Sequence, residues 1–260
     1  MNQKIYQVDA FTNKVFGGNP AAVCPLETWL SDDLMQKIAL ENNLSETAFF
    51  IPNGDRFHIR WFTPVTEVDL CGHATLAAGH VLFHHLNYEK DEIIFQSRSG
   101  ELSVIKEDEN YILNFPTDKI NRIETPDLVK NSLDCPILEC WKGREDYLVL
   151  TDSQRGVEDV NPDFGIMKKL KARGVLVTSN GEEVDFVSRC FFPAYGIDED
   201  PVTGSAHTTL TPFWAKKLGK TKMTAKQISA RGGDLVCKLD SERTKLGGQA
   251  VTYLTGEIDF

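Results

Sequence analysis

The strongest constraint on the fold is a pattern that occurs twice in the chain, because a repeat defines the architecture before any local motif does. Arg60–Pro64 and Arg189–Pro193 share the pattern R-x-F-x-P, and a strand-like run precedes each of them. Acidic residues, a glycine and a helical stretch follow in both cases. A second pair of matches, Arg98–Leu102 and Arg231–Leu235, comes after the two helices. Two matches in the same order and at nearly the same offset predict two duplicated halves.

Each half is predicted to contain strands wrapped around one central helix, Ala74–Leu86 in the first half and Ala206–Leu218 in the second. The first of these helices is apolar on nearly every face, so we expect it to be buried. A strand ends at Phe115–Asp118 and the polar segment Lys119–Thr125 follows it, which indicates a linker near residues 116–126. We therefore expect domains at residues 1–117 and 118–260, with the last strand, about 250–260, able to return to the first half.

Three further segments have clear local signals. Leu30–Leu40 is a predicted helix that Ser31-Asp32-Asp33 caps and Asn42-Asn43 ends. Glu46–Ile51 is a predicted short strand. Asn161–Leu170 is a predicted helix with Pro162 at its first position, where helices tolerate proline.

Charge and cysteine content exclude several classes of function. The 260 residues contain 28 basic and 38 acidic side chains, so no net positive field attracts nucleic acid or anionic lipid. The N-terminal segment lacks the features of a signal peptide, and the best apolar run, Ala74–Phe83, is too short to span a membrane. The six cysteines are scattered without a C-x-x-C motif and are expected to be thiols. We expect a cytoplasmic protein whose partners are neither nucleic acids nor membranes.

A glycine precedes each central helix, at Gly72 and Gly204, and this arrangement favours anion binding. Glycine lets the backbone approach a ligand closely, while the free N–H groups and the dipole of the first helical turn attract negative charge. If a pseudo-twofold axis relates the halves, both helix starts can face one interdomain cleft, which suits a small molecule that carries a carboxylate. The alternative is that both glycines only shape the turns into the helices.

Three titratable side chains near these glycines are candidates for proton transfer. His73 would lie at the positive end of its helix, where a neutral imidazole is favoured; alternatively, it is a capping or packing histidine. Glu46 stands in the apolar strand Leu44–Phe50, where burial favours the neutral acid needed for general acid–base work; alternatively, it is a solvated glutamate at a strand edge. Asp200 belongs to Asp198–Pro201, which is either a solvated turn or the source of one functional carboxylate.

Metal and nucleotide sites have weaker support. His80 and His84 have the i, i+4 spacing of zinc ligands and His85 adjoins them, but no HExxH motif or obvious third ligand is present. The sequence also lacks G-x-G-x-x-G, a P-loop and the G-x-S-x-G elbow of serine hydrolases. We therefore expect neither a metal nor a cofactor.

Five segments, in this order and spacing, resemble the motifs of the PhzF family of phenazine-biosynthesis isomerases and their relatives: Phe16–Val23, Leu44–Phe49, Asp69–Thr75, Glu199–His207 and Ser229–Gly233. The resemblance extends from about residue 5 to the C-terminus. It implies the diaminopimelate epimerase fold, an α/β (α+β) architecture of two pseudo-symmetric domains, each a curved mixed β-sheet wrapped around a central helix. It also implies, in most cases, a homodimer.

The same resemblance implies proton transfer at carbon without a cofactor. Glu46 matches the principal acid/base of the family, while His73 and Asp200 match its assisting polar residues. Backbone N–H groups would hold the substrate carboxylate, and an asparagine would line the mouth of the site. The positions that the resemblance assigns to substrate binding are Asn19, Gly72, Gly204 and Ser205.

The predicted function is therefore a cofactor-independent isomerase that moves a proton on a small carboxylate-bearing substrate by general acid/base catalysis with Glu46. One alternative is a single-cysteine epimerase, racemase or dehydratase that uses Cys71. Related epimerases use two opposed cysteines; Cys71 stands at the first of these positions, but Pro201 or Thr203 occupies the second. The other alternative is a non-catalytic protein that binds a small molecule. The family resemblance does not specify the substrate, because one fold supports many functions.

Overall fold

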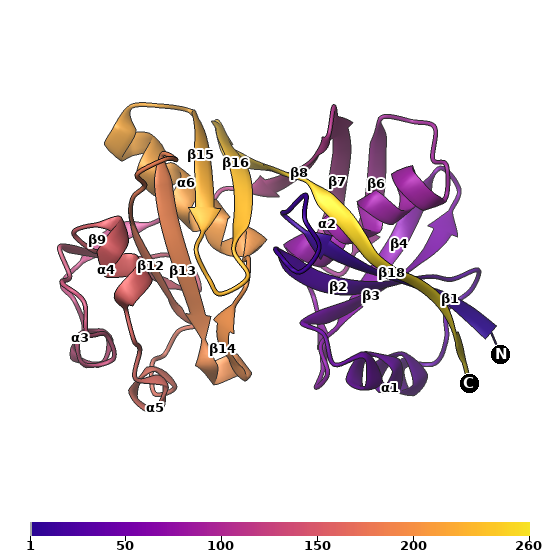
Figure 1. Cartoon of the computed structure of the whole chain (residues 1–260), viewed down its shortest axis with the longest axis horizontal. Coiled ribbons are helices and arrows are strands. Elements are labelled where there is room, and N and C mark those ends of the chain that lie inside the picture. The colour runs from indigo at the N-terminus through magenta and orange to yellow at the C-terminus, as the bar shows by residue number, and fades with distance from the viewer. Residues whose placement is uncertain (1) are drawn as a thin grey trace. The chain divides into compact units, whose positions relative to one another are not determined.

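The computed structural model describes residues 2–260, which form two compact units. The first unit contains the chain up to Asn114 together with Gly247–Phe260, and the second contains Phe115–Leu246. Each unit combines a mixed β-sheet with one buried helix, α2 in the first unit and α6 in the second (Figure 1). The chain leaves the first unit near residue 115 and returns to it for its last strand.

The first unit is built mainly from β1 (Asn2–Ala10), β2 (Asn19–Pro25), α1 (Asp32–Asn42), β3 (Glu46–Asn53), β4 (Arg56–Phe62), β5 (Glu67–Val68), α2 (Gly72–His80), the π-helical turn η1 (Val81–His85), β6 (Glu92–Ser97), β7 (Gly100–Glu107), β8 (Asn110–Pro116) and β18 (Ala250–Asp259). The second unit is built mainly from β9 (Asn121–Ile123), α3 (Asp127–Asn131), β10 (Glu139–Lys142), β11 (Tyr147–Leu150), α4 (Gln154–Asp159), α5 (Phe164–Met167), β12 (Val175–Asn180), β13 (Phe186–Phe192), the 3-10 turn η2 (Pro193–Tyr195), β14 (Ile197–Asp200), α6 (Gly204–Leu218), β15 (Lys222–Gln227), β16 (Gly233–Asp240) and β17 (Arg243–Gly248).

The sheet of the first unit surrounds a helix that has no solvent-exposed face. β2 runs parallel to β3, β3 pairs antiparallel with β4, β4 is parallel to β6, and β6 forms a hairpin with β7. All nine residues of α2 are buried, which confirms the burial predicted from its apolar composition. Gly79 lets the helix approach β7 closely, since a Cβ at this position would lie 2.8 Å from Val104 Cγ1.

The second unit repeats this order of connections. β11 runs parallel to β12, β12 pairs antiparallel with β13, β13 is parallel to β15, and β15 forms a hairpin with β16. Its central helix is anchored by Trp214, whose ring stacks on Phe186 and whose Nε1 donates to Thr178 Oγ1 at 2.9 Å. The same order of parallel and antiparallel pairs in both units confirms the predicted duplication and the α/β (α+β) class.

The R-x-F-x-P pattern has the same structural role in both units. Arg60 on β4 binds Glu67 on β5 through Nε and Nη2, both at 2.7 Å, and its guanidinium lies 5.1 Å from the ring centre of the phenylalanine two residues later. Arg189 on β13 binds Glu199 on β14 at 2.7 and 2.9 Å and lies 5.1 Å from the corresponding ring. Residues i and i+2 of a strand share one face, which explains the arginine and phenylalanine spacing. The repeat therefore encodes a bidentate ion pair between two neighbouring strands.

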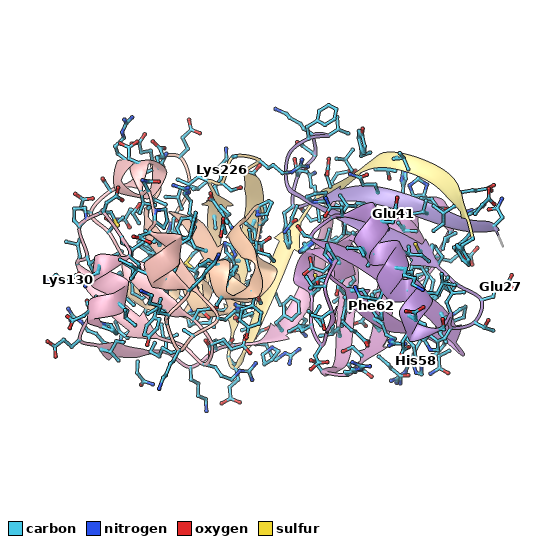
Figure 2. All side chains as sticks on the ribbon, turned by 90° about the horizontal axis from the view of Figure 1, so that it is seen from below. Glu27, Glu41, His58, Phe62, Lys130 and Lys226 are labelled. Carbon is cyan, nitrogen blue, oxygen red and sulfur yellow. The ribbon has the colours of Figure 1, made fainter. Side chains whose placement is uncertain are left out.

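The predicted caps of α1 are present. Ser31 precedes the helix and its Oγ accepts a hydrogen bond from Leu34 N at 3.3 Å, while Asn43 ends the helix in the left-handed conformation. Met35 on the inner face is buried, whereas Glu41, labelled in Figure 2, is exposed to solvent. The helix therefore covers part of the core with the amphipathic pattern that its sequence predicts.

Two sequence-based assignments are wrong. The helix predicted over Asn161–Leu170 is reduced to the single turn of α5, because the Asp163 side chain caps its start by accepting from Ile166 N at 2.9 Å, and tight i to i+3 bonds end it. The segment Lys119–Thr125, predicted as a linker, contains β9, which pairs antiparallel with β10. The conformation of the second segment therefore depends on a pairing partner elsewhere in the chain, β10, rather than on its own sequence.

The cysteines of the chain are all free, and five of the six are buried, in agreement with the prediction that they are thiols. Within residues 2–260, every helix is too short or too polar to cross a lipid bilayer.

Candidate functional site

The first unit brings together two of the predicted catalytic residues. Glu46 is the first residue of β3, and His73 is the second residue of α2. His73 Nε2 lies 3.1 Å from Glu46 Oε2, and the two side chains are 6% and 12% exposed. Glu46 Oε2 is buried and makes no hydrogen bond of good geometry to any residue in 2–260, so its contact with His73 is electrostatic rather than an aligned hydrogen bond.

Asn19 orients the His73 ring. Its Nδ2 lies 3.2 Å from His73 Nδ1, and its Oδ1 accepts a hydrogen bond from Ser45 Oγ at 3.1 Å. In the neutral ring the Asn19 amide can donate to Nδ1, and the ring proton is then on Nε2, facing Glu46; in the imidazolium Nδ1 carries a proton as well and cannot accept this hydrogen bond. Asn19 is itself fully buried at the start of β2, so the fold fixes this orientation.

The charge state of His73 follows from its neighbours. Burial lowers its pKa, but Cys71 and the Glu46 carboxylate raise it, and the net result is a pKa well above the ordinary value. Burial raises the pKa of the Cys71 thiol to about 11, so this thiol is neutral near pH 7 and the Glu46 carboxylate is the charge that stabilises the imidazolium. The helix start alone predicts a neutral imidazole. A full carboxylate charge 3.1 Å away outweighs the partial charges of the helix.

Three side chains of the first unit could also hold a metal ion. A carboxylate oxygen of Glu46, the sulfur of Cys71 and a ring nitrogen of His73 all lie within 4.8 Å of one another. Zinc accepts such donors, and it would bind the Cys71 sulfur as a thiolate, which the ion itself stabilises. The other zinc candidate, His80, bonds two hydroxyl groups through its two ring nitrogens, at 3.0 and 2.8 Å. His80 is therefore engaged in hydrogen bonds, whereas Glu46, Cys71 and His73 offer the donors of a metal site as well as those of an acid–base pair.

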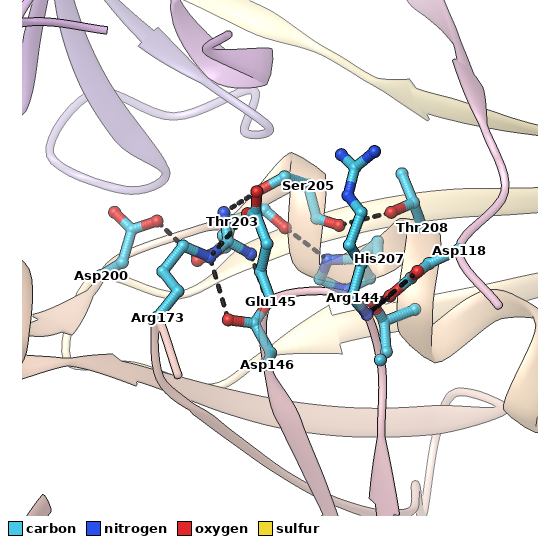
Figure 3. Close-up of polar contacts among 12 residues, drawn as sticks. Asp118, Arg144, Glu145, Asp146, Arg173, Asp200, Thr203, Ser205, His207 and Thr208 are labelled. Atoms are coloured by element: carbon cyan, nitrogen blue, oxygen red, sulfur yellow. Dashed lines mark hydrogen bonds and ion pairs between the residues drawn. The ribbon is translucent and has the colours of Figure 1, made fainter. Parts of the chain in front are cut away.

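The second unit places Asp200 at the turn into α6 (Figure 3). Thr203, the residue before the helix, donates from Oγ1 to Asp200 Oδ2 at 2.5 Å. Gln227 on β15 holds the same turn, since its Oε1 accepts from Thr203 N at 2.9 Å and its Nε2 donates to Asp200 O at 2.7 Å. All three residues are buried, so the fold fixes the position of the Asp200 carboxylate.

A buried arginine contacts the same helix start. Arg173 binds Asp146 through Nε at 2.9 Å and through Nη2, and it donates from Nη1 to Ser205 Oγ at 2.8 Å (Figure 3). Its guanidinium also lies 4.8 Å from the ring centre of Phe192. Burial lowers the pKa of Arg173, but Asp146 more than offsets this effect, so the guanidinium stays charged.

The starts of α2 and α6 differ from those of several surface helices. The side chains of Ser31, Ser153 and Asp163 cap α1, α4 and α5 by accepting a hydrogen bond from the first turn. Cys71 and Thr203, which precede the two central helices, make no such bond. The first-turn N–H groups that follow, beginning at Gly72 and Gly204, are therefore not satisfied by a side-chain cap, and a carboxylate could accept from them.

The structure groups the predicted site residues by unit. Asn19, Glu46, His73 and the helix start at Gly72 belong to the first unit, and Asp200, Gly204 and Ser205 belong to the second. Sequence reasoning missed three residues that hold these groups in place: Ser45, Arg173 and Gln227. Ser45 lies within the motif Leu44–Phe49, but no role was assigned to it, whereas Arg173 and Gln227 lie outside the five motifs. Each of the three contacts a residue of a motif.

The arrangement of a mixed sheet around a buried helix, present twice, defines the epimerase-like class of folds. A hydroxyproline epimerase from Agrobacterium vitis shares this fold, with a TM-score of 0.63 over 99% of this chain and 92% of that chain at 12% identity. The chain itself belongs to the PhzC-PhzF family, phenazine biosynthesis-like proteins, which matches residues 8–256.

Two relatives show how close this membership is. An uncharacterised isomerase of Pseudomonas aeruginosa is 48% identical over 258 residues, which cover 99% of both chains. The crystal structure of a phenazine biosynthesis protein of the PhzF family from Enterococcus faecalis has a TM-score of 0.97 at 45% identity and covers 100% of both chains. These similarities confirm the family and the fold that the five sequence motifs predicted.

Proposed function

We propose that this protein is a cofactor-independent isomerase that moves a proton between two carbon atoms of a small carboxylate-bearing molecule. Glu46 acts as the general acid and base, and His73 stabilises its charged form. Membership of the PhzC-PhzF family supports the proposal, as do the names of three relatives that are called isomerases.

The observation that carries this proposal is the buried Glu46–His73 pair. Carboxylates that brace the fold are fully engaged: Glu67 and Glu199 each accept two hydrogen bonds from an arginine. Glu46 Oε2 has only the 3.1 Å electrostatic contact with His73. A carboxylate with few hydrogen bonds keeps lone pairs free to take a proton from a substrate, and a neighbouring histidine can hold or release a proton as that charge changes.

In the proposed reaction the Glu46 carboxylate removes a proton from a carbon next to an unsaturated group. The C–H bonding electrons pass into the conjugated system, which becomes an enolate-like anion, and Glu46 returns the proton to a different carbon. No oxidant or reductant is consumed. In this proposal Asp200 assists, and the N–H groups at Gly72, Gly204 and Ser205 hold the substrate carboxylate.

Replacing Glu46 with glutamine tests the proposal, because the amide keeps the shape of the side chain but cannot carry the proton. Turnover should fall by at least about 100-fold, the usual effect of losing a general acid–base group. The measurement is the incorporation of carbon-bound deuterium into small carboxylates of a metabolite extract in D₂O, followed by mass spectrometry. The matched control is Glu41→Gln, which changes an exposed glutamate of α1 in the same unit. Full activity of Glu46→Gln would refute the proposed role.

Independence of a metal is tested separately by dialysis against a chelator. The proposed proton transfer uses only side-chain groups, so the rate of deuterium incorporation should be unchanged after metal removal. A rate that falls on chelation and returns on addition of zinc would instead assign Glu46, Cys71 and His73 to a metal site.

One observation favours the alternative in which Cys71 is the catalytic group, because its sulfur lies 3.5 Å from His73 Nδ1. The raised pKa of its thiol opposes this role, since the thiolate is the reactive form. The binding-protein alternative is distinguished by the D₂O experiment, in which a ligand would bind to the native protein without gaining deuterium.

A further inference from the structure

The strand registers identify equivalent positions in the two units. Phe49 on β3 is opposite Arg60, and Val177 on β12 is opposite Arg189, the equivalent arginine of the repeat. Glu46 lies three residues before Phe49, and Gly174 lies three residues before Val177. The position that carries the proposed acid in the first unit is therefore a glycine in the second.

The structure excludes a side chain at this second position. A Cβ on Gly174 would lie 2.1 Å from Phe191 O and 2.3 Å from Phe192 Cδ1, and neither atom belongs to the end of a flexible side chain. The polar group that reaches the start of α6 comes instead from the preceding residue, Arg173, through its bond to Ser205. Ser205 follows Gly204 as His73 follows Gly72, so the two helix starts carry different polar partners at equivalent places.

The direction of the Arg173 bond determines what Ser205 can do. A guanidinium only donates, so Ser205 Oγ is the acceptor in this bond and its own O–H remains to be donated. Among residues 2–260, the only hydrogen bond of Ser205 Oγ is the one from Arg173. A hydroxyl that accepts from a charged donor is also polarised, which strengthens the bond that it donates in turn.

We propose that Arg173 is a positioning residue that orients the Ser205 hydroxyl so that its proton is donated to a ligand carboxylate at the start of α6. Asp146 and the ring of Phe192 hold the guanidinium in place, so the direction of the bond is fixed before the ligand arrives. The Arg173–Asp146 pair has no net charge. Arg173 therefore acts through the direction of its hydrogen bond to Ser205 rather than by attracting the carboxylate with a positive charge. This inference rests on the carboxylate-binding part of the proposed function and is independent of Glu46.

Carboxylate binding can be measured without turnover, with benzoate as the probe and benzamide as its uncharged counterpart. The full-length protein labelled with ¹⁵N is titrated with each compound while the backbone amide signals of Gly204 and Ser205 are followed by NMR. Benzoate should shift both signals and benzamide should not. Absence of a benzoate-dependent shift at both amides would overturn the inference.

Variants then test whether Arg173 acts through Ser205. Ser205→Ala should weaken benzoate binding about tenfold, as expected for the loss of a hydrogen bond to a charged group. Arg173→Lys keeps the positive charge but loses the bidentate geometry, and it should weaken binding about threefold or more. In the double variant the Arg173→Lys change should have no further effect, because its target hydroxyl is already absent.

The matched control is Arg189→Lys, which alters the other bidentate arginine of the second unit without touching Ser205. It should lower thermal stability but leave benzoate affinity unchanged. If Arg173→Lys leaves benzoate affinity at the native value, or if its effect adds in full to that of Ser205→Ala, Arg173 is not a positioning residue for Ser205.

The experiments distinguish a failure of this inference from a failure of the proposed acid–base role of Glu46. Weaker benzoate binding in both Ser205→Ala and Arg173→Lys, without additivity in the double variant and with full turnover in Glu46→Gln, would refute the acid–base role and keep the inference. Native benzoate binding in both Ser205→Ala and Arg173→Lys, with turnover lost in Glu46→Gln, would refute the inference and keep the acid–base role.

Discussion

The start of the central helix differs between the two units, although the strands around it are the same. In the first unit a buried carboxylate, Glu46, contacts His73 at the second helical residue. In the second unit the equivalent strand position is Gly174, and the second helical residue, Ser205, contacts Arg173 instead. The Arg–Glu ion pair between neighbouring strands is retained in both units. Duplication has thus kept the contact that braces the strands, while one helix start has a buried carboxylate as its neighbour and the other has a buried arginine.

This difference is relevant to the type of reaction. A racemase that inverts a carbon needs one base on each face of that carbon, and a duplicated fold could supply one from each half. Here the position equivalent to Glu46 is closed to a side chain, and Pro201 or Thr203 stands where related epimerases have their second cysteine. A single group that removes a proton and returns it elsewhere suits isomerisation, in line with the proposed function.

The largest expected effect is that of Gly174→Ala, which tests whether the second unit is closed to a side chain. The added methyl group would overlap a backbone oxygen 2.1 Å away, so we expect the free energy of unfolding to fall by about 3 kcal/mol or more. Urea unfolding followed by circular dichroism measures the change. Gly165→Ala in α5 is the control, because the closest atom to its Cβ is a carboxylate oxygen at 3.2 Å. If the two variants are equally stable, position 174 tolerates a side chain, and the second unit is not closed at the place equivalent to Glu46.

A second prediction uses two buried histidines near the starts of the central helices, His73 and His207. Burial lowers the pKa of His207 to about 4, although its bond to the Thr203 carbonyl opposes the shift. Its neutral form therefore stabilises the fold above pH 6.5, and this stability is lost as the pH falls from 6.5 towards 4, at about 1.4 kcal/mol per pH unit. The pKa of His73 is raised, so its contribution is present below pH 6.5 and is lost as the pH rises through the raised value.

NMR titration of the histidine ring protons measures both groups. His207 should stay neutral down to about pH 4, and His73 should stay protonated above pH 6.5. In Glu46→Gln the pKa of His73 should fall, since the carboxylate that stabilises its charged form is gone, while that of His207 should not move. An unchanged His73 titration in this variant would show that Glu46 does not control its charge.

The smallest expected effect is that of Cys71→Ser on turnover. The Cys71 thiol is neutral near pH 7 and is not required by the proposed proton transfer, so deuterium incorporation should change by less than about threefold. Cys24→Ser, which also buries a hydroxyl in the core of the first unit, controls for a loss of stability. A loss of activity as large as that of Glu46→Gln would make Cys71 the catalytic group instead.

Much of the fold and part of the candidate site could be predicted from the sequence. The R-x-F-x-P repeat predicted the duplicated fold, because the arginine and phenylalanine are fixed by strand geometry and by the acidic partner that follows. The motifs predicted the family and singled out Glu46 and His73, which the structure places 3.1 Å apart. Local patterns worked where the interaction itself is local, as at the Ser31 cap of α1.

The remaining features depend on contacts between distant segments. Arg173 lies in a polar loop before β12, and its partners Asp146 and Ser205 are 27 and 32 residues away in the chain. Only the strand register makes it equivalent to Ser45, one residue before Glu46. The sequence also predicts the wrong direction for the pKa shift of His73. Its position at the start of a helix suggests a lowered pKa, whereas the Glu46 carboxylate raises it.

The last strand affects the order in which the chain can become structured during synthesis. β18 pairs with β1 along its whole length, from Asn2 opposite Asp259 to Ala250 opposite Ala10 (Figure 1). The ribosome therefore releases β1 long before the strand that completes its edge. The second unit, Phe115–Leu246, is continuous in sequence and can be completed earlier. Until β18 emerges, the first unit of a nascent chain therefore keeps an open β-edge at β1, the kind of edge that other chains can join, even when the second unit is complete.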